Sequence, residues 1–272
     1  LPLVLNLPLP TFDTLFVDEA QDFNEMQREL IMRCVGNGRC IIVGDPNQAI
    51  YGFRGADSNS MDIFCERLEK GSREISRFPL SLTWRCPKSV VAEANRYVSD
   101  FNCRSDAIDG GVVVNAHFAP LAGDMVLCRY NAPIVSAFYD LILQGKSAYV
   151  LGRDMTKGLI NGVKKVTRNE SMGNEEFIEL LKTDFEANYN KLVSVEKFNQ
   201  ANNLEDKYEC LLIFATKAPT VGGIIAEIKR IFDNNDKGEI MLSTVHKAKG
   251  LEADNVYILA TERMPHPKAT NP

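Results

Sequence analysis

Residues Thr14–Asp22 read TLFVDEAQD, and the predicted fold is built outward from this segment. Its apolar run Leu15–Val17 predicts a buried strand, and this strand delivers two adjacent carboxylates, Asp18 and Glu19, to its carboxyl end. In open α/β sheets this edge is where ligands bind. Because side chains alternate along a strand, the two carboxylates point in different directions. We expect Asp18 to hold Mg²⁺ and Glu19 to orient or deprotonate an attacking water; the alternative is an acidic turn without chemistry.

Residues 12–80 are predicted to alternate strand and helix, as in the connections of a parallel sheet. Asp22 and Glu25 resemble a capping box, so a helix is predicted to begin here and to run over about 23–34. Met26 and Leu30 are predicted to lie on its apolar side. The other predicted elements are strands at about 39–43 and 73–77, a helix at about 58–69 and an extended segment at about 79–84.

A second α/β domain is predicted to follow a boundary near Ser81. Its predicted elements are helices at about 87–101 and 132–144, and strands at about 112–114, 125–128, 148–151, 240–243 and 256–259. Residues 158–233 are predicted to be wholly helical. Apolar residues recur there at helical spacing, so these helices are expected to pack a core or to cover the sheet.

Three further segments accompany the first one in a fixed order along the chain. They are Gly44–Asp57 (GDPNQAIYGFRGAD), Leu82–Pro87 (LTWRCP) and Ser243–Glu252 (STVHKAKGLE). Thr14–Asp22 resembles motif II of the UvrD/Rep-type superfamily 1 DNA helicases. The three further segments resemble motifs III, IV and V of the same family, in that order. Four motifs in the right order are far more specific than any one of them. The resemblance runs from about 12 to 259 and is thinnest from about 170 to 237.

This resemblance implies an α/β fold with two RecA-like domains of the P-loop NTPase type. Residues 1–80 are then the carboxyl-terminal part of the first motor domain. Residues 81–272 are the second domain, with a small helical insertion at about 158–233. The implied function is that of an ATP-dependent DNA helicase, which couples Mg-ATP hydrolysis to 3′-to-5′ translocation on single-stranded DNA and to duplex unwinding in repair, recombination or replication. The implied cofactors are ATP and Mg²⁺, and a monomer that binds single-stranded and duplex DNA is expected.

Three residues resemble groups that act on the nucleotide in this family. Gln48 resembles the γ-phosphate sensor, because its amide can donate to a phosphate and accept from the attacking water. Arg85 resembles the arginine finger, with a surface salt bridge as the alternative. Trp84 stands where relatives usually carry a tyrosine that stacks on adenine, and its alternative is a core tryptophan at a domain junction.

The expected DNA contacts are aromatic and basic residues on turns, because aromatic faces stack on any base and cations bind phosphates. By resemblance they are Tyr51, Phe53, Arg54, Arg129, Asn131, Thr244 and His246. For Tyr51 and Phe53 the alternative is a loop aromatic that fills the core, and for Thr244 and His246 it is a structural role. Glu252 resembles a ribose ligand, and Gly250 allows close approach of the backbone to phosphates.

The composition is that of an ordinary globular protein. The 272 residues are 45% hydrophobic and 25% charged, and no apolar run approaches the ~20 residues that a membrane-spanning helix needs. The opening segment Leu1–Pro10 is proline-broken and resembles neither a signal peptide nor a membrane span. The net charge of −5 gives no global attraction to nucleic acid, so a DNA site must be a local track.

The seven cysteines are odd in number and form no C-x-x-C pair. We expect reduced thiols in a cytoplasmic protein, with zinc or disulfides as the alternatives. The sequence contains no G-x-x-x-x-G-K-[ST] motif and no counterpart of the family's motif VI. We therefore expect a piece of a helicase that is inactive alone. The rivals are a non-motor DNA-binding or regulatory protein and the motor part of a helicase–nuclease subunit.

Overall fold

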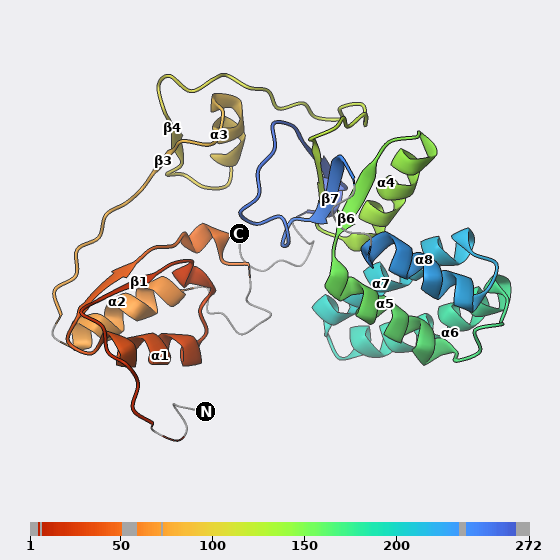
Figure 1. The fold of residues 1–272 in the computed structure, drawn as a ribbon, viewed down its shortest axis with the longest axis horizontal. Coiled ribbons are helices and arrows are strands. Elements are labelled where there is room, and N and C mark those ends of the chain that lie inside the picture. The colour runs from red at the N-terminus through yellow and green to blue at the C-terminus, as the bar shows by residue number, and fades with distance from the viewer. Residues whose placement is uncertain (1–4, 6, 51–58, 72, 234–237, 265–272) are drawn as a thin grey trace. The chain divides into compact units, whose positions relative to one another are not determined.

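The computed structural model describes residues 5, 7–50, 59–71, 73–233 and 238–264 (Figure 1). The chain divides into two compact units, Leu1–Val114 and Asn115–Pro272. Each unit is described on its own below. Among the residues that the structure describes, no helix has the length and apolarity required to cross a membrane.

The first unit is built on two short parallel strands joined by a helix. Its elements are β1 (Thr14–Val17), α1 (Glu25–Val35), β2 (Arg39–Ile42) and α2 (Ser60–Lys70), with 3-10 turns at Ala20–Asp22 and Pro46–Gln48. Parallel strands need a crossover connection, which α1 supplies. The register pairs Val17 with Ile42, so both strands end at the same edge. Val17, Ala20 and Phe64 are the buried residues around which this unit packs. The predicted strands at both motifs are confirmed.

The predicted capping box at Asp22 and Glu25 is wrong by two residues. The chain first makes the 3-10 turn over Ala20–Asp22, so helix α1 begins only at Glu25. Its cap is Asn24, whose Oδ1 accepts from the Gln27 N–H at 3.0 Å, while Gln27 Oε1 accepts from the Asn24 N–H at 3.0 Å. This reciprocal pair is a complete capping box, with asparagine and glutamine in the two roles.

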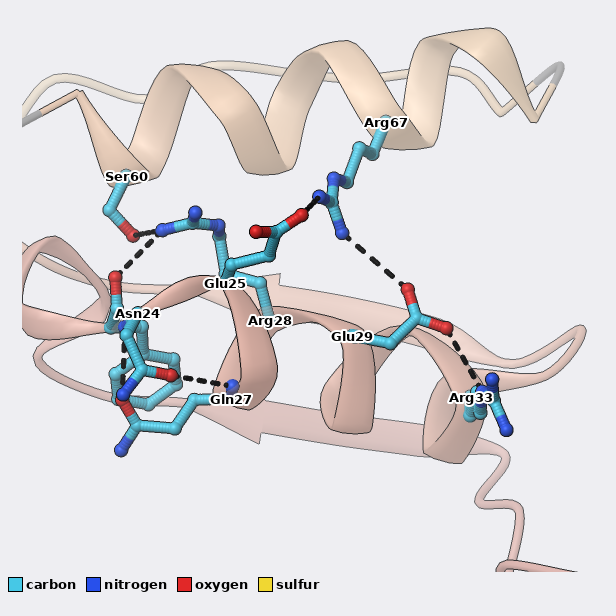
Figure 2. Close-up of polar contacts among 9 residues, drawn as sticks. Asn24, Glu25, Gln27, Arg28, Glu29, Arg33, Ser60 and Arg67 are labelled. Carbon is cyan, nitrogen blue, oxygen red and sulfur yellow. Dashed lines mark hydrogen bonds and ion pairs between the residues drawn. The ribbon is translucent and has the colours of Figure 1, made fainter. Parts of the chain in front are cut away.

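A buried arginine joins helices α1 and α2 of the first unit (Figure 2). Arg28 is 2% exposed, and its Nη1 donates to the Phe23 carbonyl at 2.7 Å and to Ser60 Oγ at 3.2 Å. The Ser60 hydroxyl in turn donates to the Ala20 carbonyl at 2.7 Å. The three groups connect α1, the start of α2 and the turn that follows β1.

The apolar side predicted for α1 is therefore only partly the buried one. Met26 and Leu30 are exposed, whereas Phe23 and Ile31 pack against the core of the unit. Outside the Arg28 contacts, the face of α1 toward α2 carries ion pairs. Arg67 on α2 lies 3.4 Å from Glu25 and 3.5 Å from Glu29.

The segment after α2 contains fewer regular elements than predicted. A second parallel pair, β3 (Leu82–Thr83) with β4 (Asn102–Cys103), encloses α3 (Lys88–Ala94). The strands predicted at 73–77 and 112–114 are wrong, because residues 73–81 and 104–114 contain no strand. Val112–Val114 are apolar but exposed, so the β-branched run forms no buried strand. Helix α3 ends at Ala94, and i→i+3 hydrogen bonds follow at Arg96 and Tyr97 instead of further helix.

The division of the chain into two compact units falls after Val114, whereas the predicted domain boundary is near Ser81. The strands β3 and β4, which follow Ser81, are hydrogen-bonded to each other and belong to a separate two-stranded sheet. The second unit has its own four-stranded sheet.

The second unit contains a parallel sheet with the strand order β6-β7-β5-β8. Its elements are β5 (Met125–Cys128), α4 (Asn131–Leu143), β6 (Ala148–Leu151), α5 (Arg153–Val166), α6 (Asn174–Ser194), α7 (Phe198–Lys217), α8 (Val221–Asp233), β7 (Ile240–Thr244) and β8 (Val256–Leu259). Every neighbouring pair in this sheet is parallel. The predicted α/β fold with parallel sheets is confirmed.

The helical region between β6 and β7 shares one core with the sheet. Strand residues Val126, Val150 and Leu242 are buried in the same cluster as Phe177 of α6 and Phe232 of α8. The predicted helices at 158–233 are confirmed, and their apolar faces are used for packing. Burial of this much apolar surface is the main stabilising contribution to the unit.

The Arg28 contacts lead to a stability prediction. Arg28→Met removes the donor to the Phe23 carbonyl and to Ser60 inside the protein, so we expect the free energy of unfolding to fall by about 2 kcal/mol. The control is Arg33→Met, which removes a half-exposed arginine paired with Glu29 on the same helix and is expected to cost less than about 0.5 kcal/mol. Urea denaturation measures both, and equal losses would contradict a structural role for Arg28.

Candidate functional site

The two carboxylates of the first motif lie at the carboxyl end of β1. Asp18 Oδ1 accepts a hydrogen bond from the Glu19 N–H at 2.9 Å. Glu19 has a backbone φ of 53°, in the left-handed region that residues other than glycine rarely adopt. The Asp18 carboxylate therefore bonds the backbone at the point where the strand ends and the 3-10 turn begins.

Gln21 is a residue of this site whose role was not predicted. It is 1% exposed, and its Nε2 donates to Glu19 Oε2 at 2.6 Å. Its Oε1 accepts from the Asp45 N–H at 3.1 Å, so one side chain joins the second motif to the third. A Cβ at Gly44 would collide with this Oε1, which explains why glycine precedes Asp45. The only signal in the sequence was the place of Gln21 within TLFVDEAQD, because its partner lies 24 residues away.

The network continues from Asp45 to the predicted phosphate sensor. Asp45 Oδ1 accepts from the Asn47 N–H at 2.9 Å and caps the 3-10 turn Pro46–Gln48. Its Oδ2 accepts from Gln48 Nε2 at 2.8 Å. The structure thus brings the predicted residues Glu19 and Gln48 into one hydrogen-bond network, with Gln21 and Asp45 as its intermediate members.

Trp84 and Arg85 directly follow strand β3. Trp84 is 76% exposed and so is not part of the core of its own unit. The Arg104 guanidinium lies 4.2 Å from the centroid of its ring, a cation–π contact. Arg85 is exposed, and its backbone N–H donates to Thr83 Oγ1 at 3.2 Å. Trp84 is therefore accessible to a stacking ligand. The predicted DNA-binding residues Tyr51, Phe53 and Arg54 lie outside the described residues.

Four predicted DNA contacts gather at one edge of the second unit. The sheet register pairs Cys128 with Thr244, so the segments after β5 and β7 leave side by side. Arg129 follows β5, and His246 follows β7. Burial, followed by the positive charge of Arg129, lowers the pKa of His246. The carbonyl of Thr244 accepts from the N–H groups of Lys247 and Ala248, both at 3.0 Å, which closes the turn.

Asn131 also lies at this edge, at the start of α4. Its side-chain amide donates to Asp206 Oδ2 at 2.6 Å, and Asp206 comes from helix α7. Gly250 has a φ of 85°, which favours glycine, although a Cβ there would meet no atom within 4 Å. Glu252 is exposed, two residues beyond.

Two family models match the chain at segments that carry part of these residues. The model of the UvrD/REP helicase N-terminal domain matches residues 7–68, and that of the UvrD-like helicase C-terminal domain matches residues 160–271. The chain belongs to the UvrD/Rep family of helicases. The first match contains Glu19, Gln21 and Gln48, and the second contains Asp206 and His246.

Curated relatives place this UvrD/Rep-family chain among much longer proteins. It is similar to F-box DNA helicase protein 1 of Schizosaccharomyces pombe, with 26% identity over 91% of this chain and 29% of that protein. It is also similar to DNA helicase II of Escherichia coli, with 32% identity over 36% of this chain and 14% of that protein. The RecBCD enzyme subunit RecB of Mycobacterium tuberculosis is 33% identical over 31% of this chain and 7% of its own length. The chain thus spans less than a third of the length of each.

The acidic groups of this UvrD/Rep-family chain fit a shared metal ion better than one bound by protein alone. No group of three or more His, Cys, Asp or Glu side chains able to hold a metal occurs among the described residues. Mg²⁺ keeps several waters and is commonly held by one or two carboxylates together with substrate phosphates. Asp18 supplies one carboxylate at the end of β1, so a phosphate ligand would have to complete the coordination of an ion held there.

The cysteine thiols are not part of this candidate site. All seven cysteines are free, and two of them, Cys128 and Cys210, are buried. Burial raises the pKa of both buried thiols. A thiol kept protonated is a poor nucleophile and a poor metal ligand, so these two act as core residues.

The role of Gln21 is tested by Gln21→Leu, which keeps the side-chain size and removes both hydrogen bonds. We expect amide hydrogen exchange at Asp45 to accelerate by about fivefold or more, because its acceptor is lost. The Ala20 amide, which donates to the Val43 carbonyl, is the internal reference. Gln27→Leu makes the same chemical change elsewhere in the unit. An Asp45 exchange rate equal in the two variants would rule out the bridging role.

The lowered pKa of His246 leads to a prediction about stability and pH. Because the folded pKa lies below the ordinary value, the unfolded state binds more protons as the pH falls through about 6.5. The contribution of neutral His246 is complete above that pH and is lost as the pH falls toward the folded pKa. We expect unfolding free energies measured between pH 8 and 5.5 to fall less steeply for His246→Gln than for wild type. His117→Gln, at an exposed position, is the control, and identical slopes for wild type and His246→Gln would contradict the assignment.

Proposed function

We propose that this chain is part of an ATP-dependent DNA helicase that couples Mg-ATP hydrolysis to translocation on single-stranded DNA and to duplex unwinding. The observation that carries the proposal is the hydrogen-bond network from Glu19 through Gln21 and Asp45 to Gln48. Phosphoryl transfer to water requires a group that orients the water and a group that senses the γ-phosphate. The network holds candidates for both at one sheet edge.

In this proposal each residue of the first unit has a defined role. Asp18 holds Mg²⁺, Glu19 orients or deprotonates the attacking water, and Gln48 contacts the γ-phosphate. When bound, Mg²⁺ neutralises the phosphate charge. Arg85 stabilises the charge that develops on the γ-phosphate, and exposed Trp84 stacks on the base. Gly250 and Glu252 contact the nucleotide phosphates and ribose.

The DNA is proposed to contact the carboxyl edge of the second sheet. Arg129, Thr244 and His246 supply one cation, one hydroxyl and one imidazole there, and such groups bind backbone phosphates without reading sequence. Tyr51, Phe53 and Arg54 are proposed to stack on bases and bind the strand. We propose 3′-to-5′ movement by a monomer inside the cell, in repair, recombination or replication. We assign 1–80 to the first motor domain and 81–272, with an insertion at 158–233, to the second. The two domain models support the order of the domains through their matches at 7–68 and 160–271.

A second candidate is the motor part of a helicase–nuclease subunit. It is favoured by the similarity to RecB and to an ATP-dependent helicase/nuclease protein of Staphylococcus haemolyticus, which is 36% identical over 31% of this chain. A non-motor DNA-binding or regulatory role is the third. Only the first two require Glu19 to be needed for turnover in the longer protein, so Glu19→Gln in the complete gene product separates them from the third.

The first prediction from this proposal concerns DNA binding. We expect the chain to bind labelled oligo-dT in fluorescence anisotropy at low salt, with an affinity that falls as salt rises because phosphate contacts release counterions. Arg129→Gln should weaken binding by about tenfold at low salt and reduce the salt slope by about one. Lys182→Gln removes the same charge from the exposed face of α6 and is expected to change affinity less than about twofold. Equal effects would refute the edge assignment.

The second prediction is that these 272 residues alone do not hydrolyse ATP. The sequence contains no G-x-x-x-x-G-K-[ST] loop, whose backbone N–H groups and lysine cradle the phosphates in such enzymes. Without that cradle, base stacking and one metal carboxylate hold only the two ends of a flexible ligand. We expect no phosphate release at millimolar Mg-ATP above a Glu19→Gln control. A turnover that depends on Glu19 would require another phosphate cradle in the chain.

A further inference from the structure

Helix α4 begins without a capping residue of its own. Its N-cap is Tyr130, whose side chain makes no capping hydrogen bond. The first residues of the helix are Asn131, Ala132 and Pro133. The N–H groups in the first turn of a helix have no intrahelical acceptor, and proline carries no N–H. The two donors that need an acceptor are therefore those of Asn131 and Ala132.

One carboxylate from a distant helix accepts from both. Asp206 Oδ1 accepts from the Asn131 N–H at 2.8 Å and from the Ala132 N–H at 2.9 Å. Its Oδ2 accepts from the Asn131 side-chain Nδ2 at 2.6 Å. Asp206 is 7% exposed and lies on α7, 75 residues further along the chain. Hydrogen bonds to an ionised acceptor are about twice as strong as neutral ones.

Helix α7 is also linked to the N-cap residue Tyr130 through Arg263. Glu209, three residues after Asp206 on α7, pairs with Arg263 at 3.3 Å. The Arg263 guanidinium lies 4.3 Å from the centroid of the Tyr130 ring. Helix α7 therefore reaches the 129–132 segment twice, through the backbone at Asn131 and through the ring at Tyr130.

We infer that Asp206 is a positioning residue for the DNA-binding edge of the second unit, and that the helical region is part of that edge. The inference rests on the proposed function and adds two assignments to it. Asn131 acts through its bonds to Asp206, because its amide donor is committed to that carboxylate. The amino-terminal end of α4 is not a phosphate site, although helix ends favour anions, because the Asp206 carboxylate already occupies it.

The direction in which DNA affinity changes after Asp206→Ala separates a positioning role from a purely electrostatic one. Asp206→Ala removes a negative charge next to a segment proposed to bind a polyanion. Electrostatics alone predicts tighter binding of DNA after this change. Positioning predicts weaker binding, because the segment that carries Arg129 loses its anchor.

The experiment measures binding of labelled oligo-dT by anisotropy for the chain and five variants. We expect Asp206→Ala and Asn131→Asp each to weaken binding by about tenfold, the first by loss of the acceptor and the second by placing two carboxylates together. The double variant Asn131→Asp with Asp206→Asn restores a donor–acceptor pair and is expected to recover to within about threefold of wild type. Asp206→Asn alone is expected to lie between, because its oxygen still accepts from the backbone. Glu186→Gln, at an exposed acid of α6, is expected to bind like wild type.

Two further readouts keep the test independent of folding and of the proposed function. Amide exchange at Asn131 and Ala132 should accelerate by about tenfold in Asp206→Ala relative to Asp206→Asn, while exchange in the strands β5 and β7 stays unchanged. The salt slope of Asp206→Ala should fall by about one, as in Arg129→Gln. Binding by Asp206→Ala as tight as or tighter than wild type, or a double variant no better than Asn131→Asp, overturns the inference. If wild type itself does not bind oligo-dT at low salt, the proposed DNA contact fails, and the exchange rates alone decide whether Asp206 anchors the segment.

Discussion

A polar side chain that leaves water must find its hydrogen-bond partners inside the protein, since a buried group left unsatisfied costs about 1–3 kcal/mol. Gln21, Arg28 and Asp206 are all buried and all bonded to groups distant in sequence. The strands that precede the turns bonded by these side chains, β1, β2 and β5, are only four residues long. They fix where the chain leaves each sheet, and the three buried side chains then hold the turns that follow.

Parallel pairing gives each unit one edge at which functional groups collect. In the first unit the register of Val17 with Ile42 brings the segments of Glu19 and Asp45 together, and the groups there are carboxylates and amides. In the second unit the register of Cys128 with Thr244 brings together a cation and an imidazole. A chain with a net charge of −5 thus confines its proposed DNA contacts to a local track. Parallel pairing thus presents acidic and amide groups in one unit and basic groups in the other. The difference lies in the turns that follow the strands and not in the strands themselves.

The sequence predicted those features that depend on local pattern. The apolar runs before Asp18 and Asn131 are strands, and the helical spacing over 158–233 is four packed helices. The parallel pairing of β5 with β7 was not predicted, and it is this pairing that places the residues after the two strands together. Patterns failed where a partner decides the outcome, as at Val112–Val114, where a β-branched run has no strand to join. A polar residue at a buried position, such as Arg28 in a helix expected to bury Met26, is decided by packing that no local pattern contains.

The partners of Gln21 and Asp206 were beyond sequence reasoning for a related reason. Each bonds to the backbone, and a backbone N–H leaves no signature in residue type. Asp206 reads as one acid among several on α7, and Tyr130 before Asn131 reads as a helix without a cap. The two observations become one only when the chain is folded and the missing cap is found on another helix. It follows that the helical region between β6 and β7 cannot be shortened freely. Helix α7 carries Asp206, which caps α4, and Glu209, which pairs with Arg263. Any version of this unit that kept Arg129 and His246 at the sheet edge but lost α7 would need a new acceptor for two N–H groups at the point where the proposed DNA strand lies.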